Sequence, residues 1–145
     1  MKVFISEMAM QSTTEVEIHC RQADEKVRRL EHYISAYEER IAGWDEQGKQ
    51  YVSPREILYF ETVDGRTFLY TKQQVLEVEM KLYELEEYLD PQEFFRCGKS
   101  LVVNVGQIVR LKPEITRNIL ATMSNGEVLS ISRRYVKAFR ELLQK

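Results

Sequence analysis

EILYFETVDGRTFLYT, residues 56–71, decides the fold of this chain. Two runs rich in aromatic and β-branched residues flank the pair Asp64-Gly65. An Asp-Gly pair between two such runs is typical of a β-hairpin with a tight turn. We therefore predict a hairpin here. A similar turn-forming pair, Asn125-Gly126, lies between two apolar runs and predicts a second hairpin.

Between and after these hairpins, short apolar runs predict further strands. Each run is bounded by polar, Gly or Pro residues, as strands of four to six residues usually are. The C-terminal half therefore reads as a series of short strands. The runs are Phe94-Phe95, 101–103, 108–111, 119–123 and 128–131.

Two segments in this region have the three-and-four spacing of a helix instead. Apolar residues from Val75 to Leu89 form one stripe, and Asp90-Pro91 would end that helix. A second helix is predicted over 133–143, with Ser132 as a plausible N-cap. Its inward-facing residues are predicted to be Val136, Phe139 and Leu143.

The N-terminal third follows a different pattern. Alternation over 16–20 predicts a short half-buried strand, in which Cys20 is a core thiol and His19 a surface imidazole. An apolar stripe from Ala23 to Ile41 predicts a helix that Gly43 ends, and 44–53 lacks periodicity and reads as a connection. We therefore divide the chain into a strand-helix extension, 1–50, and a main domain, 54–145.

Composition excludes several classes of protein. The 145 residues are 43% hydrophobic and 30% charged, which is typical of a soluble globular chain. No apolar run approaches the roughly 20 residues of a membrane span, and the first residues do not form a signal peptide, so we expect the cytoplasm. Two cysteines are too few for a disulfide framework.

Enzyme motifs are missing from the sequence. It contains no phosphate-binding glycine loop, nucleophile elbow, His-Glu-x-x-His or Cys-x-x-Cys, and only two histidines. We therefore expect no enzymatic activity, no cofactor and no metal. A nucleophilic role for Cys97 would need a base, and no candidate for one lies nearby in the sequence.

The charge distribution is asymmetric along the chain. Residues 1–90 hold 11 Lys and Arg against 19 Asp and Glu, a net of −8, whereas residues 91–145 hold 10 against 4, a net of +6. Because a charge acts over about a Debye length, ~8 Å at physiological salt, a local excess indicates a partner better than the total of −2 does. The basic C-terminal part therefore points to a polyanion.

Arginines at the start of the last predicted helix are the most informative cations. Arg133 and Arg134 follow Ser132 and occupy the first helical turn, where the helix dipole disfavours positive charge. Free N–H groups and guanidinium donors together suit a phosphate or a guanine edge. The alternative is that one or both arginines pair with acids of the N-terminal half.

Two further predicted turns carry basic residues. The loop Arg96-Cys97-Gly98-Lys99-Ser100 lies between apolar runs and has the composition of a turn that grips a nucleic-acid backbone. Its cations would lower the pKa of Cys97 if they lay close to the thiol, although a structural thiol is the simpler interpretation. Arg66 follows the Asp64-Gly65 turn, and a solubilising surface arginine is the alternative there.

Three ordered motifs resemble a known family. ILYFE (57–61), FFRCGKSLVVN (94–104) and NGEVLSISRRYVK (125–137) resemble the LytTR-type DNA-binding domain of bacterial transcription regulators over about residues 54–145. The resemblance implies a mainly β fold with flanking helices (α+β), built from small packed sheets. It also implies that loops and a helix start, rather than a recognition helix, enter successive major grooves and bend the duplex.

The family's contact positions are carried over to matching residues of this chain. Gly98-Lys99 stands where many members have His-Arg or His-Asn, so the histidine contact is replaced and Lys99 is expected to grip phosphate. Arg134 matches the base-reading arginine, and Asn104 is either a contact or a structural turn residue. The implied DNA-binding residues, with Lys137 added as a phosphate contact, are Arg66, Thr67, Arg96, Lys99, Ser100, Asn104, Ser132, Arg133, Arg134 and Lys137.

These observations predict a cytoplasmic, sequence-specific transcription regulator that binds double-stranded DNA as a homodimer. The extension lacks the length of a receiver domain, so the chain resembles stand-alone members, for which a small membrane protein encoded alongside is an implied partner. The stripe from Ala23 to Ile41 could serve self-association, that partner, or packing on the chain's own β-domain. The alternative function is a protein-interaction module or anti-regulator that binds an acidic protein.

Overall fold

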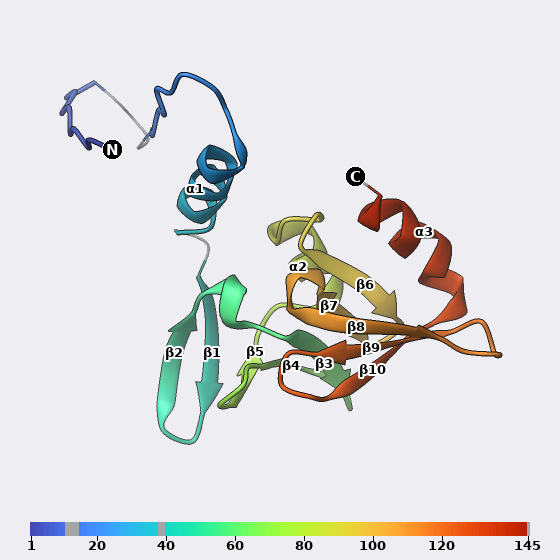
Figure 1. Cartoon of the computed structure of the whole chain (residues 1–145). Helices are drawn as coiled ribbons and strands as arrows, with labels where there is room; N and C mark the ends of the chain where they lie inside the picture. Colours follow the sequence, from blue (N-terminus) through green and yellow to red (C-terminus); the bar gives the residue numbers. More distant parts are fainter. Residues whose placement is uncertain (11–14, 38–39, 145) are drawn as a thin grey trace. The chain divides into compact units, whose positions relative to one another are not determined.

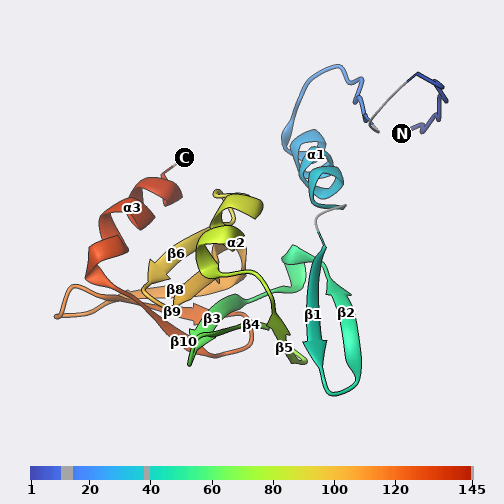
Figure 2. The same cartoon turned by 180° about the vertical axis from the view of Figure 1, so that it is seen from behind.

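The computed structural model describes residues 1–10, 15–37 and 40–144. The chain divides into two compact units, Met1–Ile34 and Ser35–Lys145, and each is described by itself. Figures 1 and 2 show the elements from opposite sides. In this described part of the chain, no helix is long and apolar enough to cross a membrane.

Helix α1, Glu25–Tyr37, is the regular element of the first unit. The Asp24 carboxylate accepts a hydrogen bond from the backbone N–H of Val27 at 3.0 Å, which caps the helix. Residues 15–20 form no strand, contrary to the prediction for 16–20, because an extended segment without a paired neighbour leaves its backbone groups to water. Cys20 is accordingly exposed rather than a core thiol.

The predicted helix end and connection at residues 41–53 are wrong. Ile41–Asp45 forms strand β1 and Gly48–Val52 forms strand β2, and the two pair as an antiparallel hairpin. Gly43 does not end a helix. A Cβ atom at this position would lie 2.7 Å from Leu76 Cβ, so glycine lets β1 approach the neighbouring strand closely.

Seven antiparallel strands form the larger sheet of the second unit, in the order β2-β1-β5-β4-β3-β7-β6. The predicted hairpin is confirmed as β3, Tyr59–Val63, and β4, Arg66–Tyr70. Asp64 and Gly65 both have positive φ, 52° and 76°, as a tight turn of this kind requires. The outer strands of the C-terminal side are β6, Phe94–Gly98, and β7, Leu101–Asn104.

The helix predicted over 75–89 is a strand followed by a shorter helix. Val75–Val78 is strand β5, which pairs with β4 so that Leu76 lies opposite Leu69. Helix α2 spans Leu82–Tyr88. The Glu84 carboxylate accepts a hydrogen bond from the N–H of Lys81, the N-cap residue, at 3.0 Å and so caps the start of this helix. Spacings of three and four along 75–82 fit either element, and pairing with β4 decides for the strand.

A second sheet has the order β10-β9-β8. It consists of β8, Ile108–Pro113, β9, Ile119–Met123, and β10, Val128–Ile131, and the predicted hairpin at Asn125-Gly126 joins the last two. Short 3-10 helices, Pro54–Glu56 and Val105–Gln107, precede β3 and β8. Together with α3, Arg133–Leu143, these elements confirm the mainly β fold with flanking helices.

Apolar side chains fill both faces of the larger sheet. Phe60, Leu69 and Leu85 belong to a buried cluster that includes α2. A second cluster joins the sheet to β9, β10 and α3 through residues such as Ile131 and Phe139. Burying a large apolar side chain of this kind stabilises the fold by about 1.5–3 kcal/mol, so α3 is held firmly by Phe139.

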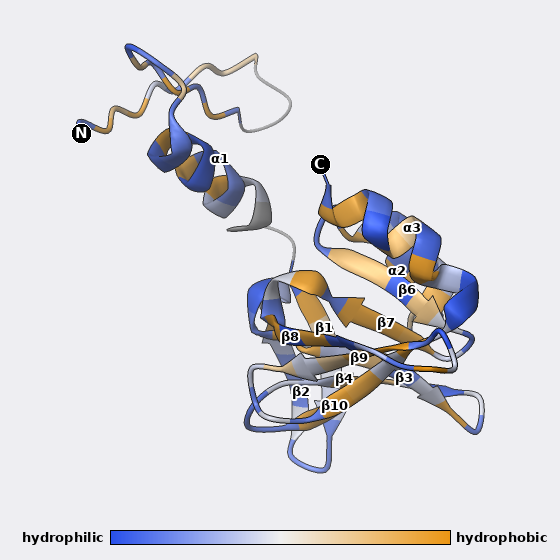
Figure 3. Cartoon of the chain, turned by 45° about the vertical axis from the view of Figure 1, so that its right-hand side comes forward, coloured by the Kyte–Doolittle hydropathy of each residue, from blue (hydrophilic) through white to orange (hydrophobic). Residues whose placement is uncertain are grey.

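The last helix begins and ends as predicted, at Arg133 and Leu143. Apolar and hydrophilic residues alternate along it, orange and blue in Figure 3. Phe139 is fully buried and Val136 is half-buried. Leu143 is 47% exposed, contrary to its predicted inward orientation, and it is the last residue of the helix, where Phe139 one turn earlier is fully buried.

A pair of stacked tyrosines links the two sheets. The rings of Tyr59 and Tyr70 lie 4.3 Å apart with an angle of 14° between them. The Tyr59 hydroxyl donates to Glu127 Oε2 at 2.7 Å, next to the β9–β10 turn. Burial and this hydrogen bond raise the pKa of Tyr59, so the hydroxyl remains a donor at neutral pH and holds the turn against the larger sheet.

Candidate nucleic-acid interface

The start of α3 is held by two other loops. Ser132 occupies the N-cap position, but its side chain makes no capping hydrogen bond. Instead, the Asn118 side chain in the β8–β9 connection accepts a hydrogen bond from Arg133 N–H at 2.9 Å. Ser132 N–H donates to the Cys97 carbonyl of β6 at 2.9 Å. The first turn of α3 is therefore tied to both β6 and the β8–β9 connection.

Backbone contacts also bring the β6–β7 turn to the β3–β4 hairpin. Thr62 N–H donates to the Ser100 carbonyl at 2.9 Å, and Thr62 lies opposite Thr67 in the hairpin register. The stretches around residues 66, 96–100 and 132–134, which are far apart in sequence, thus form one connected framework. The Ser100 side chain remains exposed at this turn.

Four of the ten sequence-predicted site residues are exposed cations that take part in none of the ion pairs of the described residues. They are Lys99, Arg133, Arg134 and Lys137. The Arg134 guanidinium lies 6.0 Å from the centre of the Tyr135 ring, which supports it without neutralising it. Among the described residues, no acid of the N-terminal half forms an ion pair with Arg133 or Arg134, contrary to the alternative interpretation.

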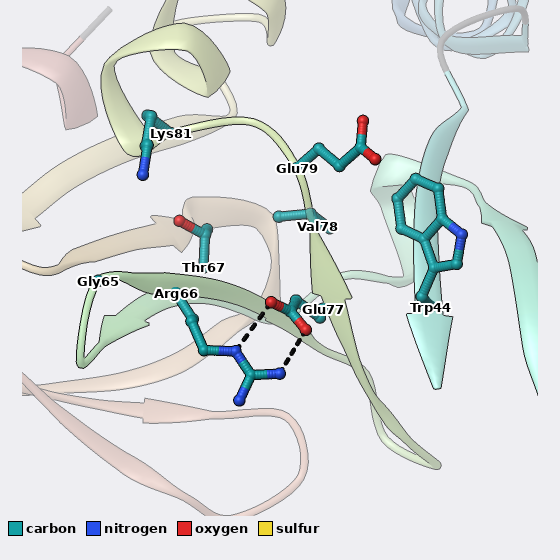
Figure 4. Close-up of a pocket in the computed structure, with 8 residues that line it drawn as sticks. All are labelled: Trp44, Gly65, Arg66, Thr67, Glu77, Val78, Glu79 and Lys81. Atoms are coloured by element: carbon teal, nitrogen blue, oxygen red, sulfur yellow. Dashed lines mark hydrogen bonds and ion pairs between the residues drawn. The ribbon is translucent and has the colours of Figure 1, made fainter. Parts of the chain in front are cut away.

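Arg66 is exposed but paired. Its Nε and Nη2 atoms donate to the two carboxylate oxygens of Glu77, on β5, at 2.9 and 2.6 Å (Figure 4). This contact raises the pKa of Arg66 and lowers that of Glu77. The pair lines a shallow pocket of about 400 Å³, with Trp44 and Lys81 at its sides.

Arg96 is bound on every nitrogen. It donates from Nε to the Gly98 carbonyl at 2.8 Å, from Nη2 to the Lys99 carbonyl at 2.6 Å, and from Nη1 to Glu86 of α2 at 3.1 Å. Its side chain is only 25% exposed. These contacts fix the β6–β7 turn that presents Lys99, so Arg96 shapes the loop.

Thr67 and Asn104 are buried, 3% and 5% exposed. The Asn104 side chain donates to the carbonyls of Ile57 and Pro54, at 2.8 and 3.4 Å, and accepts from Gly106 N–H at 3.0 Å. These bonds support the structural alternative for Asn104 over the contact alternative. Thr67 likewise faces Thr62 in the hairpin, with 3.4 Å between their hydroxyl oxygens.

Several residues of this framework were missed in the sequence. Asn118 caps α3, and no residue near it in the sequence indicates that role. Strand β8 and the connection after it add exposed cations, Arg110, Lys112 and Arg117. The run IVRLKP carries charges beside apolar residues, which favours an edge strand. Strand β8 lies at the edge of the second sheet and is exposed over most of its length.

Cys97 is a buried structural thiol. Burial raises its pKa to about 12; Arg96 lowers the pKa of Cys97 by less than burial raises it, and the buried thiol agrees with the structural interpretation. A raised pKa means that the neutral thiol stabilises the fold below the unfolded value, about 8.5, and that this contribution is lost as the pH rises toward 12.

We therefore expect selective thiol labelling. At pH 8 a thiol reagent will modify exposed Cys20 quickly and Cys97 only after denaturation. Mass spectrometry of native and urea-unfolded protein measures this. Rapid modification of Cys97 in the native protein would show that β6 does not bury it.

A family model, the LytTr DNA-binding domain, matches residues 49–144. The chain belongs to the LytTR family. A solved LytTr DNA-binding domain, of a putative methyl-accepting/DNA response regulator from Bacillus cereus, is 29% identical with a TM-score of 0.69, covering 72% of this chain and 95% of that one.

Curated relatives of the LytTR chain extend the comparison beyond the domain. A protein named as an uncharacterized HTH-type transcriptional regulator of Staphylococcus aureus is 24% identical over 145 residues, 99% of this chain and 98% of its own length. The transcriptional regulatory protein YpdB of Escherichia coli is 30% identical over 89 residues, 61% of this chain and 36% of its own. The chain is a LytTR transcription regulator and not an enzyme.

Proposed function

We propose that this LytTR chain reads a specific double-stranded DNA site in the cytoplasm, with the start of α3 in one major groove and the neighbouring loops in adjacent grooves. One observation carries the proposal. Four exposed cations, which form no ion pair with the acids of the described residues, occur on α3 and the β6–β7 turn, and a backbone hydrogen bond connects β6 to the residue before α3. Such cations suit phosphates along a duplex, and arginine suits guanine.

The proposed contacts divide into two kinds. Arg134 reads base edges, because its guanidinium is exposed in the first helical turn. Ser100 and Ser132 offer hydroxyls to the backbone. Phosphates are neutralised by Lys99, Arg133 and Lys137, with Lys112 and Arg117 added from the structure.

Arg96, Thr67 and Asn104 support this surface from behind it, since their polar groups are engaged within the protein. They shape the loops that meet the duplex. We also propose that the duplex bends, because loops spaced along one protein surface reach successive grooves more easily on curved DNA. Base pairs without direct contact would then affect affinity.

Salt dependence measures the phosphate contacts. About five neutralised phosphates per protomer predict that log K falls with log salt at a slope of about −4.5. Fluorescence anisotropy of a labelled duplex over a salt series gives this slope. A slope shallower than about −2 for one protomer would contradict the phosphate assignment.

Selection of genomic fragments by the purified chain, near physiological salt and followed by footprinting, tests the function directly. A repeated motif is expected, with protected half-sites about one or two helical turns apart. Recovery of random fragments would contradict sequence-specific binding. An acidic protein partner would then be the better candidate.

We further propose that the chain acts as a homodimer and that its N-terminal extension supplies a partner surface. Val27, Leu30 and Ile34 are only half-buried on α1, which leaves part of an apolar stripe available. A second copy or a small membrane protein encoded alongside would cover it. Light scattering of the purified chain with and without its site distinguishes a dimer in solution from pairing on DNA alone.

A further inference from the structure

Two arginines of the interface region are used in different ways. Every nitrogen of Arg96 donates to an atom of the protein, and its side chain is 25% exposed. Arg66 gives only its Nε and Nη2 atoms to Glu77, and its side chain is 62% exposed. The protein therefore uses every guanidinium nitrogen of Arg96, whereas Arg66 keeps guanidinium donors that can bind a ligand.

The guanidinium of Arg66 keeps one edge that Glu77 does not occupy. A guanidinium has a side edge, formed by Nε and one Nη, and an end edge, formed by both Nη atoms. Glu77 occupies the side edge, so the end edge keeps free donors, and Nη1 points away from the carboxylate in Figure 4. Two donors on one edge match two neighbouring acceptors such as O6 and N7 of guanine.

The surroundings restrict where this edge can move. Arg66 follows the tight turn at Gly65, and the next residue, Thr67, is buried in β4. The Phe68 ring lies 5.5 Å from the guanidinium carbon. A long arginine loses much rotamer freedom when it binds, and a carboxylate that fixes it in advance removes part of that loss before DNA arrives.

We propose that Glu77 is a positioning residue that presents the end edge of Arg66 to a guanine. This inference rests on the proposed DNA-binding function and adds a second reader, from a different loop, to Arg134. Because an exposed ion pair contributes little to folding, the value of this pair lies in orientation. Glu77 touches no base itself.

Three substitutions separate orientation from charge. E77A removes the carboxylate and both acceptors, whereas E77Q removes the same charge but keeps one oxygen that accepts from Arg66. E79Q is the matched control, because Glu79 is an exposed acid of the same pocket and the ion pair of Arg66 is with Glu77. Duplexes with each base pair of the selected site replaced in turn identify the position at which R66A loses its preference.

We expect the wild type to prefer G·C at that position by about tenfold. E77A should lose most of this preference, E77Q should retain an intermediate part, and E79Q should match the wild type. Equal changes for E77A, E77Q and E79Q on all duplexes would overturn the proposal, because Glu77 would then act only through its charge. A wild-type preference that persists in E77A would also overturn it.

The proposed function fails separately. If the wild type prefers no duplex, sequence-specific binding itself is wrong, and the wild-type measurement alone shows this. If the wild type is selective and R66A is equally selective at every position, only the Arg66 inference fails. Thermal unfolding of each variant, followed by circular dichroism, verifies that the compared proteins are folded.

Discussion

Replacing Arg134 by alanine is expected to weaken binding to the selected DNA site by about 1–3 kcal/mol, roughly a 5- to 150-fold loss of affinity. Arg134 is exposed in the first turn of α3, lies over the Tyr135 ring and forms no ion pair with the acids of the described residues. Removing it should leave nonspecific affinity nearly unchanged, because other cations contact the phosphates. The preference for one base pair should disappear, because Arg134 is the proposed base contact.

Arg140 supplies the control for this measurement. It is also exposed on α3 but lies in the last turn, away from the helix start. Arg140→Ala removes one positive charge and should keep the base preference. Anisotropy titrations with the selected duplex and its single-pair variants compare the two. An equal loss for both arginines on every duplex would show that Arg134 contributes only charge.

Replacing Asn104 by alanine is expected to destabilise the fold by about 2–4 kcal/mol. The side chain satisfies the Ile57 carbonyl and Gly106 N–H, and a further contact reaches Pro54. Because Asn104 is buried, its removal leaves polar groups without partners, and each such group costs about 1–3 kcal/mol. Urea unfolding measures the loss.

Asn104→Asp and Asn125→Ala make this test specific. Aspartate keeps the acceptor for Gly106 N–H but cannot donate to the Ile57 carbonyl. We therefore expect Asn104→Asp to lower the free energy of unfolding as well. Asn125 is exposed in the β9–β10 turn and its replacement should cost less. If Asn104→Ala were fully stable and had lost DNA affinity, the residue would be a DNA contact instead.

Local signals in the sequence were sufficient for much of the fold. Asp64-Gly65 and Asn125-Gly126 predicted two hairpins because few residues adopt the positive φ angles of tight turns easily. The short runs from 94 to 131 predicted strands, and 133–143 predicted α3 at its observed bounds. These features depend on neighbouring residues alone.

The wrongly predicted elements are those whose secondary structure depends on pairing with residues far away in the sequence. The apolar stripe of the predicted first helix runs to Ile41, but residues 41–45 pair with β2 and Trp44 also pairs with β5, which makes this segment strand β1. Residues 75–78 fit a helical stripe, and pairing with β4 makes them β5. Alternation at 16–20 predicts a strand that finds no neighbour among the described residues.

By itself, the sequence determined which residue types were available for binding: a basic C-terminal third and arginines at a helix start. Only the tertiary structure decided which cations remain available, because ion pairs and hydrogen bonds form between strands that lie far apart in sequence. Arg96 and Arg134 look alike in the sequence. The fold engages every nitrogen of Arg96 and leaves Arg134 exposed, since distance in space, and not order along the chain, determines which charges meet.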